Sequence, residues 1–472
     1  MLEEAPPAIR SGLQAPVACV QGLGFVGAAV CVAVASARDG QGQPAYRVIG
    51  VDLPTPEGAR RIAALNRGEF PFPSTDGSLA ARLRQAREAG NLVTCADPAA
   101  FAGADIVIVN VPLDVRLDQP ALALAPFQGA IRAIGQHMRS DALVIVETTV
   151  PPGATETIVA PILIEELQRR GLPHDGFRLA HCYERVMPGN AYLDSILGMP
   201  RVYSGRDVRS ADACERFLRS VLDPRRCRLT RLASTTASEL GKVLENTYRA
   251  VTIALMEEFA AFAEAAGVDL FDVAAPIRAR PSHSNMRTPG LGVGGYCLTK
   301  DPLLAELGAR DVLGLDQEFP LASLAVRINR RAPRRALDRL RTLLGGSLAG
   351  GQILLLGLTY RQDVGDTRHS PSYDFYAAAQ AEGAGLQVHD PLVEHWQEAG
   401  VAVPCQVPCA GGLHAVVLAV PHQFYRSFDY AAWLAGSCPL FLDAFDVLSR
   451  EQRQALRALG CRVESVGRGA GL

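Results

Sequence analysis

The amino-acid sequence predicts an α/β protein with two doubly wound parallel sheets, joined by a central helical domain that contains one long helix. Short apolar runs of strand length alternate with helix-like stretches in the first and last thirds of the chain, which is the pattern of parallel βαβ units. Between them, residues 235–267 contain no proline and only one internal glycine, Gly241. Because 472 residues are too many for a single hydrophobic core, we expect several domains.

The N-terminal third begins with a short buried strand expected at residues 15–21. A glycine-rich turn follows, and then a helix rich in alanine and valine that extends to about residue 38. A second strand is expected at 46–53, with further strand-like runs at 106–111 and 143–147. This order predicts a parallel, doubly wound sheet.

The central third contains the long helix, which ends at Gly267 and exceeds the usual globular length. A second helical stretch is expected at about 321–344. Long helices of this kind serve as a spine between domains or as a dimer interface, so we expect one of these roles. Apolar residues recur at helical spacing: Leu240, Val243, Leu244, Tyr248, Val251, Leu255, Phe259 and Phe262.

The C-terminal third repeats the α/β alternation, with strand-like runs at 352–357, 386–389, 415–419 and 440–442. It therefore reads as a second open α/β domain.

Three domains are expected from these patterns. An N-terminal domain covers residues 1–205, a central helical domain that carries a cysteine-containing loop covers 206–330, and a C-terminal α/β domain covers 331–472.

The amino-acid composition argues against a nucleic-acid-binding protein and against a membrane-spanning protein. The net charge of −2 gives no basic field for nucleic acid, and no apolar run is long enough to span a membrane. The acidic N-terminus, from Met1 to Pro7, lacks the basic region of a signal peptide. The eleven cysteines are scattered, and Cys405 and Cys409 have no further partner for a metal site, so we expect reduced thiols, a cytoplasmic location and no bound metal.

Gly22, Gly24 and Gly27 form a G-x-G-x-x-G pattern between the first strand and the first helix. The first glycine allows a tight turn, the second a close approach of pyrophosphate, and the third close packing of the helix. Asp52, at the end of the second strand, would accept hydrogen bonds from a ribose 2′-hydroxyl and repel a 2′-phosphate, which favours NAD over NADP. The alternative is a plain glycine turn with Asp52 as an ordinary strand-end cap.

Cys297 follows a run of glycines that begins at Gly290, and Lys300 and Asp301 come directly after it. A cysteine thiolate is a strong nucleophile, and glycines let a substrate approach the backbone closely. A redox cofactor combined with such a thiol suggests oxidation through a covalent intermediate. Asp301 before Pro302 also resembles a helix N-cap, and the positive end of that helix could lower the pKa of Cys297.

Lys242 and Asn246 are four residues apart and therefore share one face of the long helix, where they could stabilise an oxyanion. The alternative is a solvated face on which Glu239, Lys242 and Glu245 form ordinary surface pairs. Arg368, in a loop of the C-terminal domain, could meet a phosphate or a uracil oxygen, or could be an exposed loop arginine.

Taken together, these segments resemble the UDP-glucose/GDP-mannose dehydrogenase family over nearly the whole chain. The resemblance implies two Rossmann-like domains, the second of which binds nucleotide sugar, and a homodimer. It also implies NAD as cofactor and the four-electron oxidation of a sugar C6 alcohol to a carboxylate, through a thiohemiacetal and a thioester on Cys297. The motifs that carry it, in order, are the glycine fingerprint, Thr-Val-Pro-x-Gly at 149–153, Glu184, Lys-x-x-x-Asn at 242–246, Gly-Gly-x-Cys-x-x-Lys-Asp at 294–301 and Asp-x-Arg-x-Ser at 366–370.

The same resemblance implies roles for individual residues. Lys242 and Asn246 would stabilise the oxyanion, Thr149 and Asp301 would hold water or assist proton transfer, and Glu184 would be the base in thioester hydrolysis. The candidate catalytic residues are Cys297, Lys242, Asn246, Asp301, Thr149 and Glu184. The candidate cofactor-binding residues are Gly22, Gly24, Phe25, Val26, Gly27, Asp52, Thr149 and Lys300. The candidate substrate-binding residues are Glu184, Arg185, Lys242, Asn246, Asn285, Gly294, Tyr360 and Arg368.

Four positions depart from the commoner family pattern. Tyr296 replaces a histidine, Cys182 a serine, Leu113 a threonine and His283 an arginine. The segment that contains Glu184-Arg185 and Pro188-Gly189 resembles the branch that oxidises UDP-N-acetylhexosamines, with UDP-glucose or GDP-mannose as alternatives. The resemblance implies that the product of this enzyme is used in a surface-glycan biosynthetic pathway.

Two other functions remain as alternatives. A two-electron β-hydroxyacid dehydrogenase would share the N-terminal domain and the Lys-x-x-x-Asn pair, but needs neither Cys297 nor a third domain. A non-catalytic NAD-binding protein would not need Cys297, Lys242 and Asn246.

Overall fold

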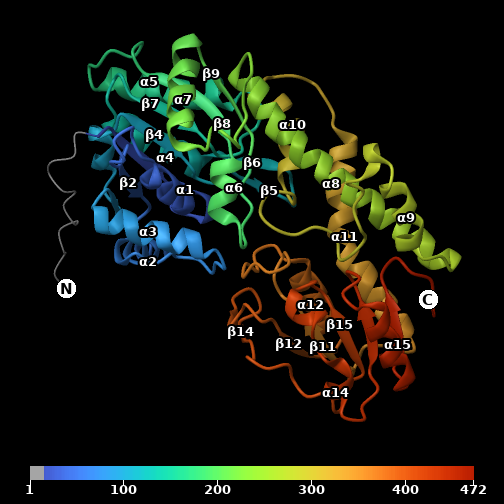
Figure 1. Cartoon of the computed structure of the whole chain (residues 1–472). Coiled ribbons are helices and arrows are strands. Elements are labelled where there is room, and N and C mark those ends of the chain that lie inside the picture. The colour runs from blue at the N-terminus through green and yellow to red at the C-terminus, as the bar shows by residue number, and fades with distance from the viewer. Residues whose placement is uncertain (1–14, 472) are drawn as a thin grey trace. The chain divides into compact units, whose positions relative to one another are not determined.

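The computed structural model describes residues 15–471 (Figure 1), so the acidic N-terminal segment lies outside the described residues. The chain forms two compact units. The first contains Met1–Leu244 and Leu303–Glu318, and the second contains Glu245–Pro302 and Phe319–Leu472. Helix α8, Thr235–Ala266, contributes residues to both. None of the helices in the described part of the chain is long and apolar enough to cross a membrane.

The first unit is built on an eight-stranded sheet in the order β10-β9-β8-β7-β4-β1-β2-β3. Its strands pair in parallel except for β8 with β9, and the order reverses at β1 and β4, where such sheets bind ligands. The four strands expected in this region are confirmed, each trimmed by one to three residues. The strands are β1 Val17–Gln21, β2 Arg47–Val51, β3 Leu92–Cys95, β4 Ile106–Val109, β7 Leu143–Val146, β8 Arg178–Tyr183, β9 Arg201–Gly205 and β10 Leu229–Arg231.

Helices cover both faces of this sheet, which confirms a doubly wound fold. One face packs against α1 Phe25–Ser36, α3 Gly77–Ala89, α6 Tyr192–Gly198 and α7 Val208–Val221. The remaining elements are α2 Pro56–Arg67, η1 Pro98–Gly103, the hairpin β5 Asp114–Arg116 and β6 Ala121–Ala123, α4 Leu124–His137, η2 Thr155–Val159 and α5 Ala160–Arg169.

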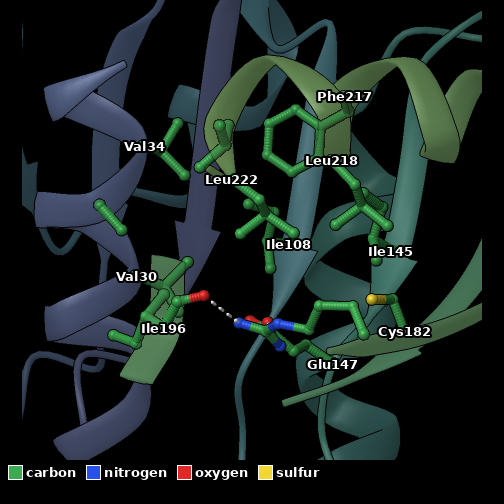
Figure 2. Close-up of a pocket in the computed structure, with 13 residues that line it drawn as sticks. Val30, Val34, Ile108, Ile145, Glu147, Cys182, Ile196, Phe217, Leu218 and Leu222 are labelled. Atoms are coloured by element: carbon green, nitrogen blue, oxygen red, sulfur yellow. Dashed lines mark hydrogen bonds and ion pairs between the residues drawn. The ribbon is translucent and has the colours of Figure 1, made fainter. Parts of the chain in front are cut away.

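A buried ion pair lies under the apolar core of this unit. Figure 2 shows Val30, Ile108, Ile145 and Phe217 around a cavity of about 30 Å³, with Glu147 at its floor. Glu147 Oε1 accepts a hydrogen bond of 3.0 Å from Arg201, and both side chains are less than one-tenth exposed. The cavity has room for only a water or two, so it is not a ligand site.

The central helices are α8, α9 Leu270–Arg278, α10 Leu304–Leu307 and α11 Pro320–Leu343, and the predicted bounds of α8 and α11 are confirmed to within a residue. Short turns lie at η3 Pro281–His283, η4 Asp301–Leu303 and η5 Gly308–Val312. The apolar residues of α8 are mostly exposed, with Phe262 at 69%, whereas the alanines at 250, 254, 260 and 263 are buried. Small side chains let neighbouring elements pack close to the buried side of the helix.

The second unit contains a five-stranded parallel sheet in the order β12-β11-β15-β16-β17, with hydrophobic cores on both faces. The four predicted strands are confirmed. The strands are β11 Gln352–Leu356, β12 Gly385–His389, β15 Ala415–Leu418, β16 Leu440–Asp443 and β17 Val463–Ser465. The other elements are α12 Pro371–Ala381, the hairpin β13 His395–Trp396 and β14 Val401–Ala402, α13 Gln423–Arg426, α14 Tyr430–Leu434 and α15 Arg450–Ala458.

Candidate active site

The glycine fingerprint forms the turn between β1 and α1. Gly22 has a positive φ of 88°, and a Cβ there would lie 2.9 Å from the carbonyl oxygen of Asn110. A Cβ on Gly27 would lie 1.8 Å from the carbonyl oxygen of Gly22, so neither position accepts a side chain. Gly24 faces open space, and the N-terminus of α1 has no side-chain cap. The turn is therefore shaped to admit a pyrophosphate at the helix N-terminus, beside Phe25 and Val26.

Asp52 follows β2, the strand next to β1, as the fingerprint predicts. Its carboxylate accepts backbone hydrogen bonds from Leu23 at 3.3 Å and from Leu53 at 2.9 Å. Arg61 also lies 3.4 Å from this carboxylate. These contacts fix the carboxylate at the strand end where a ribose hydroxyl would bind.

Lys242 and Glu184 lie together in the first unit. The ammonium group of Lys242 donates a hydrogen bond of 2.8 Å to the backbone oxygen of Glu184, and it lies 3.8 Å from the carboxylate. Arg185 donates to the backbone oxygen of Pro200 at 2.8 Å, and its guanidinium lies over the ring of Tyr183. Lys242 is 6% exposed, so the interpretation of this face as a solvated surface is wrong.

The solvated-face alternative would leave Glu239 exposed, but this side chain is completely buried. Its carboxylate accepts hydrogen bonds from the backbone amides of Gly153 at 2.6 Å and Thr155 at 2.8 Å. Burial raises its pKa to about 7. Glu239 therefore anchors the turn that follows Thr149 to helix α8, a role that no local sequence signal indicated.

The turn that carries Cys297 is tied to a buried carboxylate in the second unit. Asp301 is completely buried, and it accepts hydrogen bonds of 2.7 Å from the Asn246 amide and 2.7 Å from the Lys300 ammonium group. Its backbone amide donates to the carbonyl oxygen of Cys297 at 2.8 Å. Asn246, Lys300 and Asp301 thus form one network around the backbone of the half-buried cysteine.

The expected N-cap role of Asp301 is wrong. Asp301 opens the short turn η4, and the N-cap position of α10 is Leu303, which makes no side-chain cap. The carboxylate of Asp301 is instead occupied by Asn246 and Lys300, and α10 has only four residues.

The glycines before Cys297 allow close packing within the second unit. A Cβ on Gly294 would lie 2.6 Å from Pro371, and one on Gly295 would lie 2.8 Å from the ring of Tyr360. Burial raises the pKa of Tyr360 to about 12. Glu257, buried and paired with Arg335 at 2.8 Å, accepts backbone hydrogen bonds at the start of this glycine run.

A buried histidine–aspartate pair holds the loop that carries Tyr360. Asp390 accepts hydrogen bonds from the backbone amides of Leu358 at 2.7 Å and Thr359 at 3.3 Å. His422 accepts from the amide of Asp363 through Nδ1 at 2.9 Å, which leaves Nε2 as the donor toward Asp390 at 3.1 Å. Sequence reasoning missed both residues, because Asp390 lies 31 positions and His422 lies 63 positions after Thr359.

Arg368 and Asn285 are exposed, and each already interacts with another side chain of the protein. Arg368 forms a two-contact ion pair with Asp366, at 3.0 and 2.8 Å, and its side chain is 51% exposed. Asn285 donates to the hydroxyl of Tyr248 at 2.9 Å. The positive charge of Arg368 is therefore matched by a carboxylate of its own loop.

The four departures from the family pattern occupy different environments. Cys182 and Leu113 are buried, Tyr296 is half-buried and His283 is exposed. The ring of Tyr296 lies 4.3 Å from the ammonium group of Lys300, a cation–π contact. Across residues 15–471, no group of three histidine, cysteine, aspartate or glutamate side chains could hold a metal ion.

Three family models match the chain in sequence order. The NAD binding domain of the UDP-glucose/GDP-mannose dehydrogenase family matches residues 17–221, the central domain matches 236–331, and the UDP binding domain matches 354–450.

Relatives and solved structures agree with these matches. UDP-N-acetyl-D-mannosamine dehydrogenase of Pyrococcus horikoshii is 30% identical over 416 residues, which are 87% of this chain and 90% of that protein. NDP-N-acetyl-D-galactosaminuronic acid dehydrogenase of Ralstonia nicotianae is 27% identical over 87% of this chain and 92% of that protein. The structure of a UDP-glucose dehydrogenase from Pyrobaculum islandicum superimposes with a TM-score of 0.80, at 25% identity, over 98% of this chain and all of that one.

Proposed function

The chain belongs to the UDP-glucose/GDP-mannose dehydrogenase family and oxidises a nucleotide sugar with NAD, and we propose that the reaction converts the C6 hydroxymethyl group of a UDP-N-acetylhexosamine to a carboxylate through Cys297. The observation that carries this proposal is the turn of Cys297 closed onto the buried network of Asp301, Asn246 and Lys300. A two-electron β-hydroxyacid dehydrogenase is disfavoured by the match to a UDP binding domain.

The thiol is required because an aldehyde cannot lose hydride directly. The C6 alcohol is first oxidised to an aldehyde, and the thiolate of Cys297 then adds to the carbonyl carbon, which becomes tetrahedral. Loss of hydride from this adduct leaves a thioester, and water cleaves the carbon–sulfur bond to release the carboxylate and the thiolate. NAD, when bound at the β1–α1 turn, accepts the hydride of each oxidation.

The remaining residues stabilise charge and move protons in this proposal. Lys242 and Asn246 stabilise the oxyanion of the tetrahedral adducts. One amide hydrogen of Asn246 is held by Asp301, which fixes the side chain and leaves the second for the oxyanion. Glu184 is the base for thioester hydrolysis, and Thr149 and Asp301 position water.

The class of substrate, the domain boundaries and the cellular role of the protein are also proposals. Relatives named for N-acetylated sugars, together with Glu184-Arg185 in this chain, support a UDP-N-acetylhexosamine over UDP-glucose or GDP-mannose. We propose three domains at 1–205, 206–330 and 331–472, and the match of three family models in this order supports their number. A cytoplasmic role in polysaccharide biosynthesis follows from the family.

The stoichiometry of NADH tests the proposed reaction. We expect about two NADH per sugar consumed, with a uronate product, when the protein is given NAD and one of UDP-ManNAc, UDP-GlcNAc or UDP-GalNAc. UDP-glucose and GDP-mannose are the comparison substrates. One NADH per sugar with a free carbonyl product would contradict the thioester route.

A homodimer through α8 is supported by the apolar side chains that this helix leaves exposed. Tyr248, Leu255, Phe259 and Phe262 are each between 46% and 69% exposed, and they recur at helical spacing. An apolar stripe of this kind, repeated on a second copy, is self-complementary and can close a two-fold dimer.

Phe259→Asp is expected to convert the wild-type dimer to monomer at micromolar concentration, because it places a charge in the apolar stripe. Light scattering during size-exclusion chromatography measures this. Leu459→Asp makes the same kind of change at a 48% exposed leucine outside α8 and should leave the dimer intact. A wild-type monomer, or equal behaviour of the two variants, would refute the dimer proposal.

A further inference from the structure

The end of strand β8 packs against the first turns of helix α8 within the first unit. His181 and Tyr183 are two residues apart on β8 and therefore share one face of the strand, and both are buried. Ser238 and Lys242 are four residues apart on α8 and share one face of the helix. Nδ1 of His181 shares a hydrogen bond of 2.7 Å with the Ser238 hydroxyl, and the Lys242 ammonium group lies 5.5 Å from the centre of the Tyr183 ring. The strand is thus attached to the helix one turn before Lys242.

We propose that His181 is a positioning residue for Lys242, because its bond to Ser238 fixes the turn of α8 that sets the ammonium group beside Glu184. This inference rests on the proposed function, in which Lys242 stabilises the oxyanion and Glu184 is the base. The ammonium group donates a hydrogen bond of 2.8 Å to the backbone oxygen of Glu184, the residue that follows β8. The same strand therefore carries both Glu184 and the histidine that holds the helix of Lys242.

A serine of the neighbouring strand completes this attachment. Ser204 of β9 lies directly opposite His181 in the antiparallel pair of β8 and β9, and its hydroxyl shares a hydrogen bond of 2.6 Å with Ser238. All three side chains are completely buried, so water cannot replace a bond that is broken. A shift of α8 by one residue, about 1.5 Å along its axis, would break both hydrogen bonds. The three side chains therefore fix the position of the helix along β8.

His181 makes this contact without adding a charge. Burial, and then the positive charge of Lys242, lower the pKa of His181 to about 3. The imidazole is therefore neutral near neutral pH, and it adds no second positive charge that would repel the ammonium group. A neutral ring can hold the helix in place while Lys242 keeps its contact with Glu184.

The test compares two substitutions of His181 in the full-length protein. His181→Leu removes the bond to Ser238, and we expect kcat for the nucleotide sugar to fall about ten-fold or more, with a change in KM of less than about three-fold. The fall is expected in kcat because Lys242 acts on the oxyanion of the tetrahedral adducts, which forms only during the reaction. His181→Asn should recover most of kcat, because its amide can serve Ser238 as a donor or as an acceptor.

Chemical labelling of Lys242 gives a measurement that needs no turnover. Lys242 is 6% exposed and is hydrogen-bonded to Glu184, so acetic anhydride should acetylate it slowly in the wild-type protein. Mass spectrometry of the peptide that contains Lys242 measures this rate. We expect His181→Leu to raise the rate several-fold, because the ammonium group loses its fixed position, and His181→Asn to keep the rate close to that of the wild type.

Asn91→Leu is the matched control for the loss of buried hydrogen bonds in the same unit. Asn91 is completely buried, and its amide donates to the carbonyl oxygens of Ala35 at 2.9 Å and Tyr46 at 3.0 Å. It precedes β3 and therefore lies at the N-terminal edge of the sheet, opposite the edge that carries the candidate site. This variant should lower the melting temperature but leave kcat and the labelling rate of Lys242 unchanged.

Wild-type values of kcat and of the labelling rate in His181→Leu would overturn the proposal. Equal losses of kcat in His181→Leu and His181→Asn would overturn it too, as would a loss of the same size in Asn91→Leu, because the cause would then be general destabilisation. If the labelling rates follow the prediction but no nucleotide sugar yields NADH with the wild-type protein, the proposed reaction fails and the placement of Lys242 by His181 stands.

Discussion

Replacement of Cys297 by alanine is expected to abolish uronate formation, with a loss of at least about a thousand-fold in the rate of the complete reaction. Cys297 is half-buried in the turn that Asp301 closes, and no other side chain of this turn can form a thioester. Without the thiol, the aldehyde has no nucleophile that converts it to a tetrahedral adduct, so the second hydride cannot be lost. This prediction is tested by measuring the rate of NADH formation and the amount of uronate in the same assay.

Cys405→Ala provides the control, because Cys405 is an exposed thiol of the same unit outside the site. It should retain the wild-type rate and stoichiometry. Full turnover in Cys297→Ala would favour a two-electron β-hydroxyacid dehydrogenase and would contradict the covalent mechanism through Cys297.

A second variant makes the intermediate visible. Glu184→Gln removes the proposed base for hydrolysis, so acyl enzyme is expected to accumulate. Mass spectrometry of the peptide that contains Cys297 should then show the added mass of the nucleotide sugar acyl group. An unmodified peptide in a variant that still releases NADH would contradict the assignment of Glu184.

Arg201→Met is expected to destabilise the first unit by about 3–5 kcal/mol, because it leaves Glu147 buried without its counter-charge. Glu147 also accepts a hydrogen bond from Asn110 at 3.0 Å, and Arg201 donates to the carbonyl oxygens of Tyr183 at 3.3 Å and Ile196 at 3.4 Å. The pair therefore joins the ends of β4, β7 and β8 to β9, and Figure 2 shows the apolar side chains that line the small cavity above it.

Thermal and urea unfolding measure this effect, which corresponds to a fall of about 10 °C or more in melting temperature. Burial raises the pKa of Glu147 although Arg201 lowers it, so loss of Arg201 raises that pKa further. The destabilisation should therefore shrink as the pH falls and Glu147 becomes protonated, since a neutral carboxyl needs no counter-charge.

The double variant Glu147→Leu/Arg201→Met is the control that separates the effect of an unpaired charge from the effect of lost packing. It removes both buried charges and should recover much of the stability lost in Arg201→Met. If the double variant is as unstable as the single one, the pair matters through its shape and hydrogen bonds, and the explanation from an unpaired charge is wrong.

Much of the fold follows from short-range patterns in the sequence. The glycine fingerprint and Asp52 lie at the predicted strand ends, because a βαβ turn is specified by residues a few positions apart. The bounds of α8 and α11 were predictable for the same reason, since helical periodicity and the absence of proline or glycine are local signals.

Partners that are distant in the sequence could not be predicted. Glu239 looked like a surface charge, yet it binds the amides of Gly153 and Thr155 more than 80 positions away. Asp301 looked like a helix cap, but Asn246 and Lys300 occupy its carboxylate. Burial and pairing are properties of the assembled chain, which no spacing within one segment contains.

The sequence by itself determined the order of the α/β elements and the family, because these depend on local spacing and on side-chain identity. Only the tertiary structure decided which charges are matched. It pairs Arg368 with Asp366, buries Glu239 against the amides of Gly153 and Thr155, and holds Asp301 between Asn246 and Lys300. Electrostatic pairing depends on distances between segments far apart in the chain, and folding sets those distances.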